Sequence, residues 1–457
     1  MGAIFLILLS VVGVAAQRQD ESKLHAAFRT EGVRFHESCK GFQFKPILSC
    51  AQFLVTDHPL HITGGSIAPQ DGFGAGVAFA YQRDYSALRT SWDTDAVVSP
   101  NLSWRAGLYV KLVPTSKTQT HTQVFPILNF YAQGISLNTL TFFGLGPATQ
   151  RTGRTFFGMT EFIGGANGIL PVFNRIGLSL FGEVNDRSVS IRADHGQSSP
   201  SIEQIYDEAT APGLTHQPNF VQFGEGARLR HPFFTDRIQL DYLVTFQQFI
   251  APGASSNSFR RFTSDLSHQF PLYGHSNAPR NGDRQGPNEC KQDLQNTVDA
   301  TDRSANCPRI AVSRNLAGVF GIRLLISESI APAGNIVPFY FQPTIGGSDI
   351  NGNPSLNSFQ DYRFRAPNVL LLRGSYDQSI YDPLGITFMV DEGKAALTRD
   401  DVDFNHLAHT YSIGLTIRAG GFPQVALLYS WGGHEGTHTS ASVNTSLLGG
   451  STRPSLF

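Results

Sequence analysis

The sequence has few charged residues and, beyond its first sixteen residues, no long apolar segment. Charged residues make up 16% of the 457 residues, and the 35 Lys and Arg nearly balance the 36 Asp and Glu. Without a basic excess, the sequence predicts no nucleic-acid-binding surface. No later stretch reaches the roughly 18 to 20 consecutive apolar residues of a transmembrane helix. A location in a membrane would therefore have to come from strands.

Cysteine is also scarce, with only 4 residues. By proximity the cysteines pair as Cys39–Cys50 and Cys290–Cys307, and neither pair has the Cys-x-x-Cys spacing of zinc or redox sites. An exported protein meets an oxidising compartment, so two local disulfides are expected there. Free thiols are the alternative, because a sequence alone does not fix the connectivity.

The N-terminus has the features of an export signal. An apolar run ends in Val14-Ala15-Ala16, which resembles a small-residue cleavage site, although Met1-Gly2-Ala3 carries no basic residue. We predict a signal peptide over residues 1–16, with a short membrane anchor as the alternative. The next segment, residues 17–60, has mixed charge and is too short for an ordinary domain. We interpret it as a periplasmic leader or plug-like segment before a barrel over residues 61–457.

Strand-like segments recur through the rest of the chain. Residues 102–112, 238–247 and 411–418 alternate apolar with polar or small side chains. Alternation over 8–11 residues is typical of strands with one apolar and one polar face, and of transmembrane barrel strands. About sixteen candidates result, an even number as bacterial barrels require. They are 73–83, 102–112, 123–133, 137–145, 154–166, 172–186, 218–230, 237–249, 257–268, 309–327, 336–343, 368–379, 385–393, 409–419, 423–432 and 438–447.

The connections alternate between short turns and long polar loops. Residues 168–171 and 420–423 have the Gly and Pro of tight turns, whereas 187–217, 269–308 and 344–367 are long. Short turns on one rim and long loops on the other are typical of outer-membrane barrels. A soluble sandwich or propeller is the alternative, but a propeller would show a repeat of roughly 40–50 residues, and we find none. The predicted fold class is all-β, a sixteen-stranded antiparallel transmembrane β-barrel.

Three segments carry a family resemblance: His58 to Val77, Phe142-Phe143-Gly144-Leu145-Gly146-Pro147, and Gly346 to Lys394. In this order they resemble the bacterial surface antigen superfamily of outer-membrane barrels, which includes the assembly factors BamA and TamA. In that family a long loop between the eleventh and twelfth strands folds into the lumen. Our candidate strands place eleven before residues 344–367 and five after. The resemblance implies translocation or assembly of protein or lipid at the bacterial outer membrane; a passive channel or structural surface protein is the alternative.

The resemblance also implies how the loop is held. Phe359 takes the place of the aromatic at the loop tip, and Asp391 that of an acid on the inner wall, but Asn357-Ser358 stands where the family has arginine-glycine. An amide cannot replace a guanidinium in a charge-assisted pair. Either Arg363 or Arg365 pairs with Asp391, or the loop is held more weakly or is solvated. The loop and strand signature comprises Gly346, Gly347, Phe359, Arg363, Arg365 and Asp391.

Two further features bear on partners. Assembly factors of the resembled family carry periplasmic repeat modules, and residues 17–60 are too few for them, which implies a periplasmic partner that supplies substrate recognition. Phe457 matches the terminal aromatic that the barrel assembly machinery reads in many outer-membrane barrels. Outer-membrane lipid is the third expected partner.

One motif suggests an enzyme. His434-Glu435-Gly436-Thr437-His438 matches the His-Glu-x-x-His pattern of zinc proteases, which requires a helix that places both imidazoles on one face. The flanking glycines and β-branched residues instead indicate a turn that enters a strand. Residues four apart in a strand are separated by about 13 Å, too far to share one zinc ion. The sequence therefore predicts no metal, no cofactor and no enzymatic activity.

Overall fold

The structure is a computed structural model that describes residues 60–114, 126–174, 176–194, 199–233, 237–273, 316–381, 384–419, 422–433 and 435–443, together with Arg29 and Val33. The predicted signal peptide, nearly all of the predicted leader, the four cysteines and Phe457 lie outside these residues. Within them, no helix has the length and apolar character needed to cross a bilayer.

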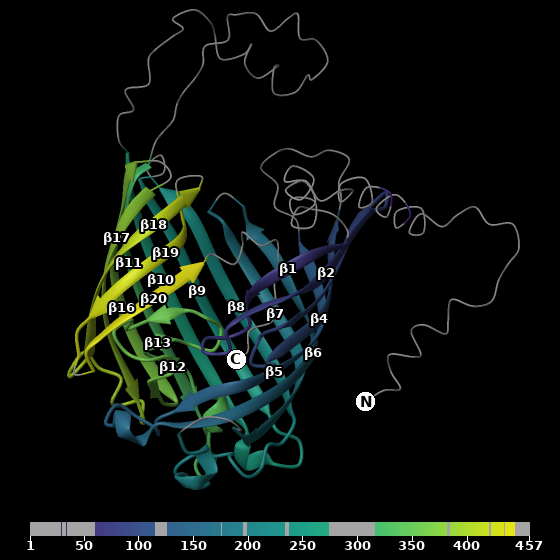
Figure 1. Cartoon of the computed structure of the whole chain (residues 1–457). Helices are drawn as coiled ribbons and strands as arrows, with labels where there is room; N and C mark the ends of the chain where they lie inside the picture. Colours follow the sequence, from purple (N-terminus) through teal and green to yellow (C-terminus); the bar gives the residue numbers. More distant parts are fainter. Residues whose placement is uncertain are drawn as a thin grey trace, which may run out of the picture.

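Sixteen strands form one sheet that curls into a barrel (Figure 1). Each strand pairs antiparallel with its neighbours, and the order follows the sequence throughout. The prediction of a sixteen-stranded antiparallel barrel is confirmed. The strands are β1 (Leu60–Ser66), β2 (Phe73–Asp84), β3 (Leu88–Val98), β4 (Trp104–Pro114), β5 (Ile127–Phe142), β6 (Thr155–Phe173), β7 (Leu178–Ala193), β8 (Phe220–Phe233), β9 (Ile238–Ile250), β10 (Phe259–Tyr273), β11 (Leu316–Ile330), β16 (Asn368–Tyr381), β17 (Leu384–Ala396), β18 (Ala408–Ala419), β19 (Phe422–Trp431) and β20 (Thr437–Val443).

The strand count was predicted correctly although four individual assignments were wrong. Strands β1 and β3 were missed, the candidates 123–133 and 137–145 are the single strand β5, and 336–343 contains a short 3-10 helix, η5 (Phe339–Phe341). The eleven candidates before the long loop therefore match the eleven strands there in number only, through compensating errors, whereas each of the five candidates after it corresponds to one strand. Strand β3 escaped detection because Thr90 and Thr94 interrupt the apolar residues on the face that carries Trp92, which weakens its contrast with the polar face.

The predicted turn at residues 168–171 is also wrong. These residues lie inside β6, and the chain turns after Phe173. Pro171 is tolerated because the register of β6 and β7 shifts beside it, between Pro171 and Phe173, and proline is confined to such irregular positions in sheets. The predicted turn at 420–423 connects β18 to β19, and its residues 420 and 421 lie outside the described part of the chain.

The barrel wall is polar inside and apolar outside, as β18 shows. Thr410, Ser412 and Thr416 are buried on its inner face, whereas Leu415 and Ile417 on the outer face are 61% and 50% exposed. A soluble core would require the opposite distribution. Large exposed hydrophobic side chains recur on most other strands as well, and such an outward band is typical of barrels in a bilayer. They include Leu108, Phe130, Phe162, Leu180, Phe223, Phe262, Phe320, Phe388 and Leu427.

An aromatic core fills the end of the barrel at which the β5–β6, β7–β8, β9–β10 and β11–β16 connections lie. Phe339, Tyr340 and Phe341 of η5 are fully buried. The Phe339 ring lies 5.2 Å from Phe142 at the end of β5 and 5.3 Å from Phe157 of β6, both edge to face. The cluster extends to β8, β9 and β10 through Phe220, Phe249 and Phe259. The first part of the β11–β16 connection is thereby fixed inside the barrel by aromatic packing.

We predict that Phe339→Ala lowers the free energy of unfolding by about 3–5 kcal/mol, because it leaves a cavity among buried rings. Reversible urea unfolding of the barrel in detergent micelles or vesicles would measure it. The matched control is Phe404→Ala, whose side chain is 64% exposed and should change the free energy by less than about 0.5 kcal/mol. Equal effects of the two substitutions would contradict the packing role.

Candidate functional site

The candidate site is formed by residues 331–367, the connection between β11 and β16, which we call the lumen loop. It folds into the barrel and contains two short hairpins (Figure 1). In one, β12 (Thr344–Ile345) pairs with β15 (Phe364–Arg365); in the other, β13 (Gly347–Ser348) pairs with β14 (Pro354–Ser355). Its apolar residues pack against the inner faces of β16 and β17, in a cluster of Ile345, Leu356, Phe359, Phe364, Ala366, Val369, Leu371 and Ala395. The predicted lumen-folded loop is confirmed.

Gly346 and Gly347 allow the two hairpins to lie close together. Their φ angles are +104° and +64°, in the region that favours glycine. A Cβ on Gly346 would lie 2.7 Å from the Cβ of Arg363, and one on Gly347 would lie 2.5 Å from the backbone nitrogen of Asp361. Any side chain at either position would force the lumen loop apart.

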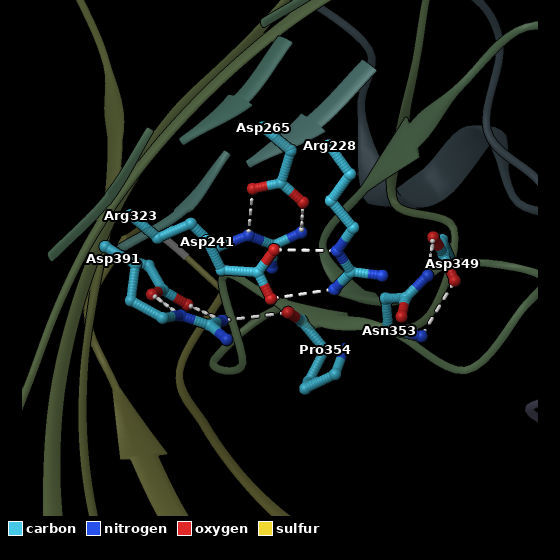
Figure 2. A network of polar contacts seen from close by, with 9 residues as sticks. Arg228, Asp241, Asp265, Arg323, Asp349, Asn353, Pro354 and Asp391 are labelled. Carbon is cyan, nitrogen blue, oxygen red and sulfur yellow. Dashed lines mark hydrogen bonds and ion pairs between the residues drawn. The ribbon is translucent and has the colours of Figure 1, made fainter. Parts of the chain in front are cut away.

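The tip of the loop is held by a buried ion pair on the barrel wall. Asp391 of β17 is 1% exposed and faces Arg373 of β16 in the register of the two strands. Arg373 Nε and Nη2 donate to the two carboxylate oxygens at 2.6 and 2.8 Å. The loop completes this pair through its main chain: Leu356 N–H donates to Asp391 Oδ2 at 2.8 Å, and Arg373 Nη2 donates to the Pro354 carbonyl at 2.8 Å. We call these four groups the tip clamp. Figure 2 shows Asp391 and Pro354 of this group.

The prediction that Arg363 or Arg365 pairs with Asp391 is wrong. Arg363 Nε instead pairs with Glu435 Oε1 at 2.6 Å, and its guanidinium also donates to Thr149. Arg365 donates to the main-chain carbonyls of Phe339 and Gln342. Both arginines therefore fasten the lumen loop to its surroundings, one to other loops and one to the loop's own aromatic segment.

The residues at the place of the family's arginine-glycine make a different contact. Ser358 Oγ lies 2.7 Å from Thr410 Oγ1 of β18 and donates to the Gly432 carbonyl at 3.1 Å. Phe359 packs edge to face on Phe364, with ring centroids 5.0 Å apart, and lies directly over Gly433. The loop tip is therefore attached to β18 by a hydroxyl, whereas the guanidinium in contact with Asp391 comes from the wall.

The tip clamp is one end of a charged band across the inner wall. At the other end of the band, Arg228 of β8 pairs with Asp241 of β9 (Figure 2). Between them, Arg323 of β11 donates through Nε and Nη2 to the two carboxylate oxygens of Asp265 of β10, each at 2.8 Å. Arg323 and Arg373 are direct neighbours in register, so two like charges lie side by side. Each is neutralised by its own aspartate, on opposite sides. Removal of Asp391 would leave two adjacent guanidinium groups with one carboxylate, that of Asp265 on the far side of Arg323.

A cavity of about 340 Å³, lined by both polar and apolar residues, separates the loop tip from β9–β11. Arg323 and Asp265 line its wall side, and Asp349 and Asn353 its loop side. Asp349 accepts hydrogen bonds from the Asn353 main chain and side chain (Figure 2), which keeps the tip folded on itself. The tip is therefore bound to β16–β18 and faces this cavity on its other side.

The His-Glu-x-x-His pattern does not form a helix. Glu435 is in the ion pair with Arg363, and residues 437–443 form strand β20. His434 lies outside the described residues. In the described part of the chain, no three His, Cys, Asp or Glu side chains gather as a metal site would require.

Comparisons with known proteins give similarity in structure alone. No family model and no curated protein matches the sequence. Among solved structures, BamA from Haemophilus ducreyi lacking POTRA domains 1–3 is 10% identical with a TM-score of 0.47, and covers 84% of this chain and 70% of its own. CdiB from Escherichia coli is 11% identical with a TM-score of 0.47, over 84% of this chain and 62% of its own. OccK11 (OpdR) from Pseudomonas aeruginosa is 10% identical with a TM-score of 0.30, over 84% of this chain and 89% of its own.

We predict that Asp391→Leu lowers the free energy of unfolding by about 3–5 kcal/mol, because it leaves Arg373 buried without its counter-ion. The double variant Arg373→Met/Asp391→Leu should recover most of this loss, since apolar groups of similar volume remove the need for compensation. Urea unfolding of the wild type, both single variants and the double variant gives the coupling energy. Additive effects of the two substitutions would contradict a coupled pair.

Proposed function

We propose that this chain is an integral outer-membrane barrel of the bacterial surface antigen type, and that it assists translocation or assembly of protein or lipid. Membrane placement is supported by the outward apolar band and the polar inner wall. The motifs around Gly346-Gly347, Phe359 and Asp391 support the family type. The observation that carries the function is the tip clamp, which holds a folded loop inside the lumen.

A loop inside the lumen narrows the path that an empty barrel would leave open. The Arg373–Asp391 pair is nearly dry, and a buried ion pair adds little stability compared with apolar residues of the same volume. The contribution of this ion pair to the stability of the barrel wall therefore does not explain its presence. Its geometry does match a positioning role, since both members keep one hydrogen bond for the main chain of the loop. We infer that the loop is a working part that regulates passage through the lumen.

A second candidate function is a passive channel, which is favoured by the exposed charges at the β8–β9 end of the charged band. Arg228, Arg230 and Asp241 are substantially exposed to the lumen, as charges that line an aqueous path would be. In both functions the partners are outer-membrane lipid and the barrel assembly machinery. The translocation function adds a periplasmic partner for substrate recognition. Neither function involves catalysis, a metal or a cofactor.

We predict that the purified wild type in planar bilayers gives low, flickering conductance, because the lumen loop stays in place. Asp391→Lys should give a larger and steadier conductance, since it removes the acceptor of the Leu356 N–H, puts a third cation beside Arg323 and Arg373, and so releases the loop tip. In cells that carry Asp391→Lys as the sole copy, the substrate's level in the outer membrane should fall. The matched control is Asp84→Lys, an exposed residue near the end of β2.

A steady open pore in the wild type, unchanged by Asp391→Lys, would instead establish the passive channel. Loss of barrel formation in Asp391→Lys is separated from loss of function by the mobility of unheated protein on gels, which distinguishes folded from unfolded barrels. Asp391→Asn, which keeps the size of the side chain and removes its charge, provides a milder variant for the same two measurements.

A further inference from the structure

We propose that the rim of the barrel at which the lumen loop begins and ends contains a binding site for the phosphorylated headgroup of a membrane lipid. The site is a cavity of about 550 Å³ between the β5–β6 connection, the lumen loop and the β17–β18 connection. This volume suits a glycerol phosphate or a sugar phosphate. The inference rests on the proposed placement in a membrane and adds a ligand that the translocation function does not require.

The lining of this rim cavity is cationic. Three permanent cations, Arg151, Arg363 and Lys394, face it with one carboxylate, Glu435. Arg363 and Glu435 are paired with each other. Arg151 lies in the short 3-10 helix η2 (Arg151–Gly153) and is exposed, and its side chain has neither ion pair nor hydrogen bond with any residue that the structure describes. A phosphate would supply the acceptor that this guanidinium lacks.

Lys394 provides a second donor. Its ammonium group lies 2.7 Å from Asp403 Oδ1, and Asp403 also accepts from Asn405. The bond from Lys394, followed by those from Asn405, lowers the pKa of Asp403 to about 2. The carboxylate therefore stays ionised and holds Lys394 in position at the end of β17. An ammonium group has three N–H donors, so two remain for a phosphate.

The position of the cavity distinguishes a lipid from a soluble anion. His409 lines the cavity at the start of β18, and its ring centroid lies 5.8 Å from that of Tyr411. Tyr411, Tyr429 and Trp431 are exposed on the outer face, and the ring centroid of Trp431 lies 6.2 Å from that of Tyr411 and 6.0 Å from that of Tyr429. Tyr and Trp in such groups mark the headgroup level of a bilayer. The cavity therefore adjoins the level at which lipid phosphates lie.

The test uses the full chain, purified in detergent and incubated with dioleoyl phosphatidate or with dioleoylglycerol, which lacks the phosphate. Native mass spectrometry would measure how much lipid each sample retains. We expect phosphatidate to be retained in preference to dioleoylglycerol. The double variant Arg151→Gln/Lys394→Gln should retain about tenfold less phosphatidate, since it loses hydrogen bonds to a charged group.

The matched control is Arg399→Gln, an exposed arginine of the same β17–β18 connection that pairs with Glu328 and does not line the cavity. It should retain phosphatidate like the wild type. The variant Arg151→Lys/Lys394→Arg keeps both charges and should restore most retention, which excludes misfolding as the cause of a loss. Unheated gel mobility would verify the barrel in every sample.

Equal retention of phosphatidate by the wild type and the glutamine double variant would overturn the site. Displacement of phosphatidate by inorganic phosphate at the same concentration would overturn the lipid assignment in favour of a soluble anion. These results are independent of conductance. A steady pore in the wild type would contradict the proposed function and leave lipid retention intact, whereas loss of retention would leave the conductance result standing.

Discussion

The pairing of Arg373 with Asp391 is the interaction on which the arrangement inside the barrel depends. Neither side chain is satisfied by the other alone. Asp391 Oδ2 accepts from both Arg373 and the Leu356 N–H, and Arg373 Nη2 donates to both Asp391 and the Pro354 carbonyl. Charged groups that lack these bonds in a dry site would be costly. The wall pair and the loop tip therefore require each other, and the pair is fully satisfied only when the loop is in the lumen.

The lumen loop changes character along its length to match the wall that it meets. Its first part, Val337 to Phe341, is apolar and aromatic and packs where β5, β6, β8, β9 and β10 also end in buried phenylalanines. Its later part, Ser348 to Ser355, is polar and lies beside the charged band of β8–β17. An interior with one aromatic region and one charged region accepts this loop in a single orientation. The exposed apolar side chains on the outer face of the barrel take no part in holding the loop.

Period-two alternation predicted the strands with one polar and one apolar face, and failed where that contrast was weak, as in β1 and β3. The partner of Asp391 was missed for a different reason. Arg363 and Arg365 are close to the loop tip in sequence, whereas the residue that lies opposite Asp391 is set by the register of β16 and β17. Tyr381 pairs with Leu384 at the β16–β17 turn, and a register shift between Tyr381 and Ser379 then places Arg373 opposite Asp391. An arginine in the apolar run of β16 was the available signal.

This placement of the guanidinium also explains the sequence of the loop tip. The resemblance implies an arginine on the loop itself, whose side chain would have to reach the wall. Here the wall supplies both charges, and the tip contributes a carbonyl from Pro354 and an N–H from Leu356. Main-chain groups are present whatever the side chain, apart from the N–H that proline lacks. Asn357-Ser358 can therefore stand at the loop tip without loss of this attachment, because the ion pair lies on β16 and β17 and the loop completes it with main-chain groups alone.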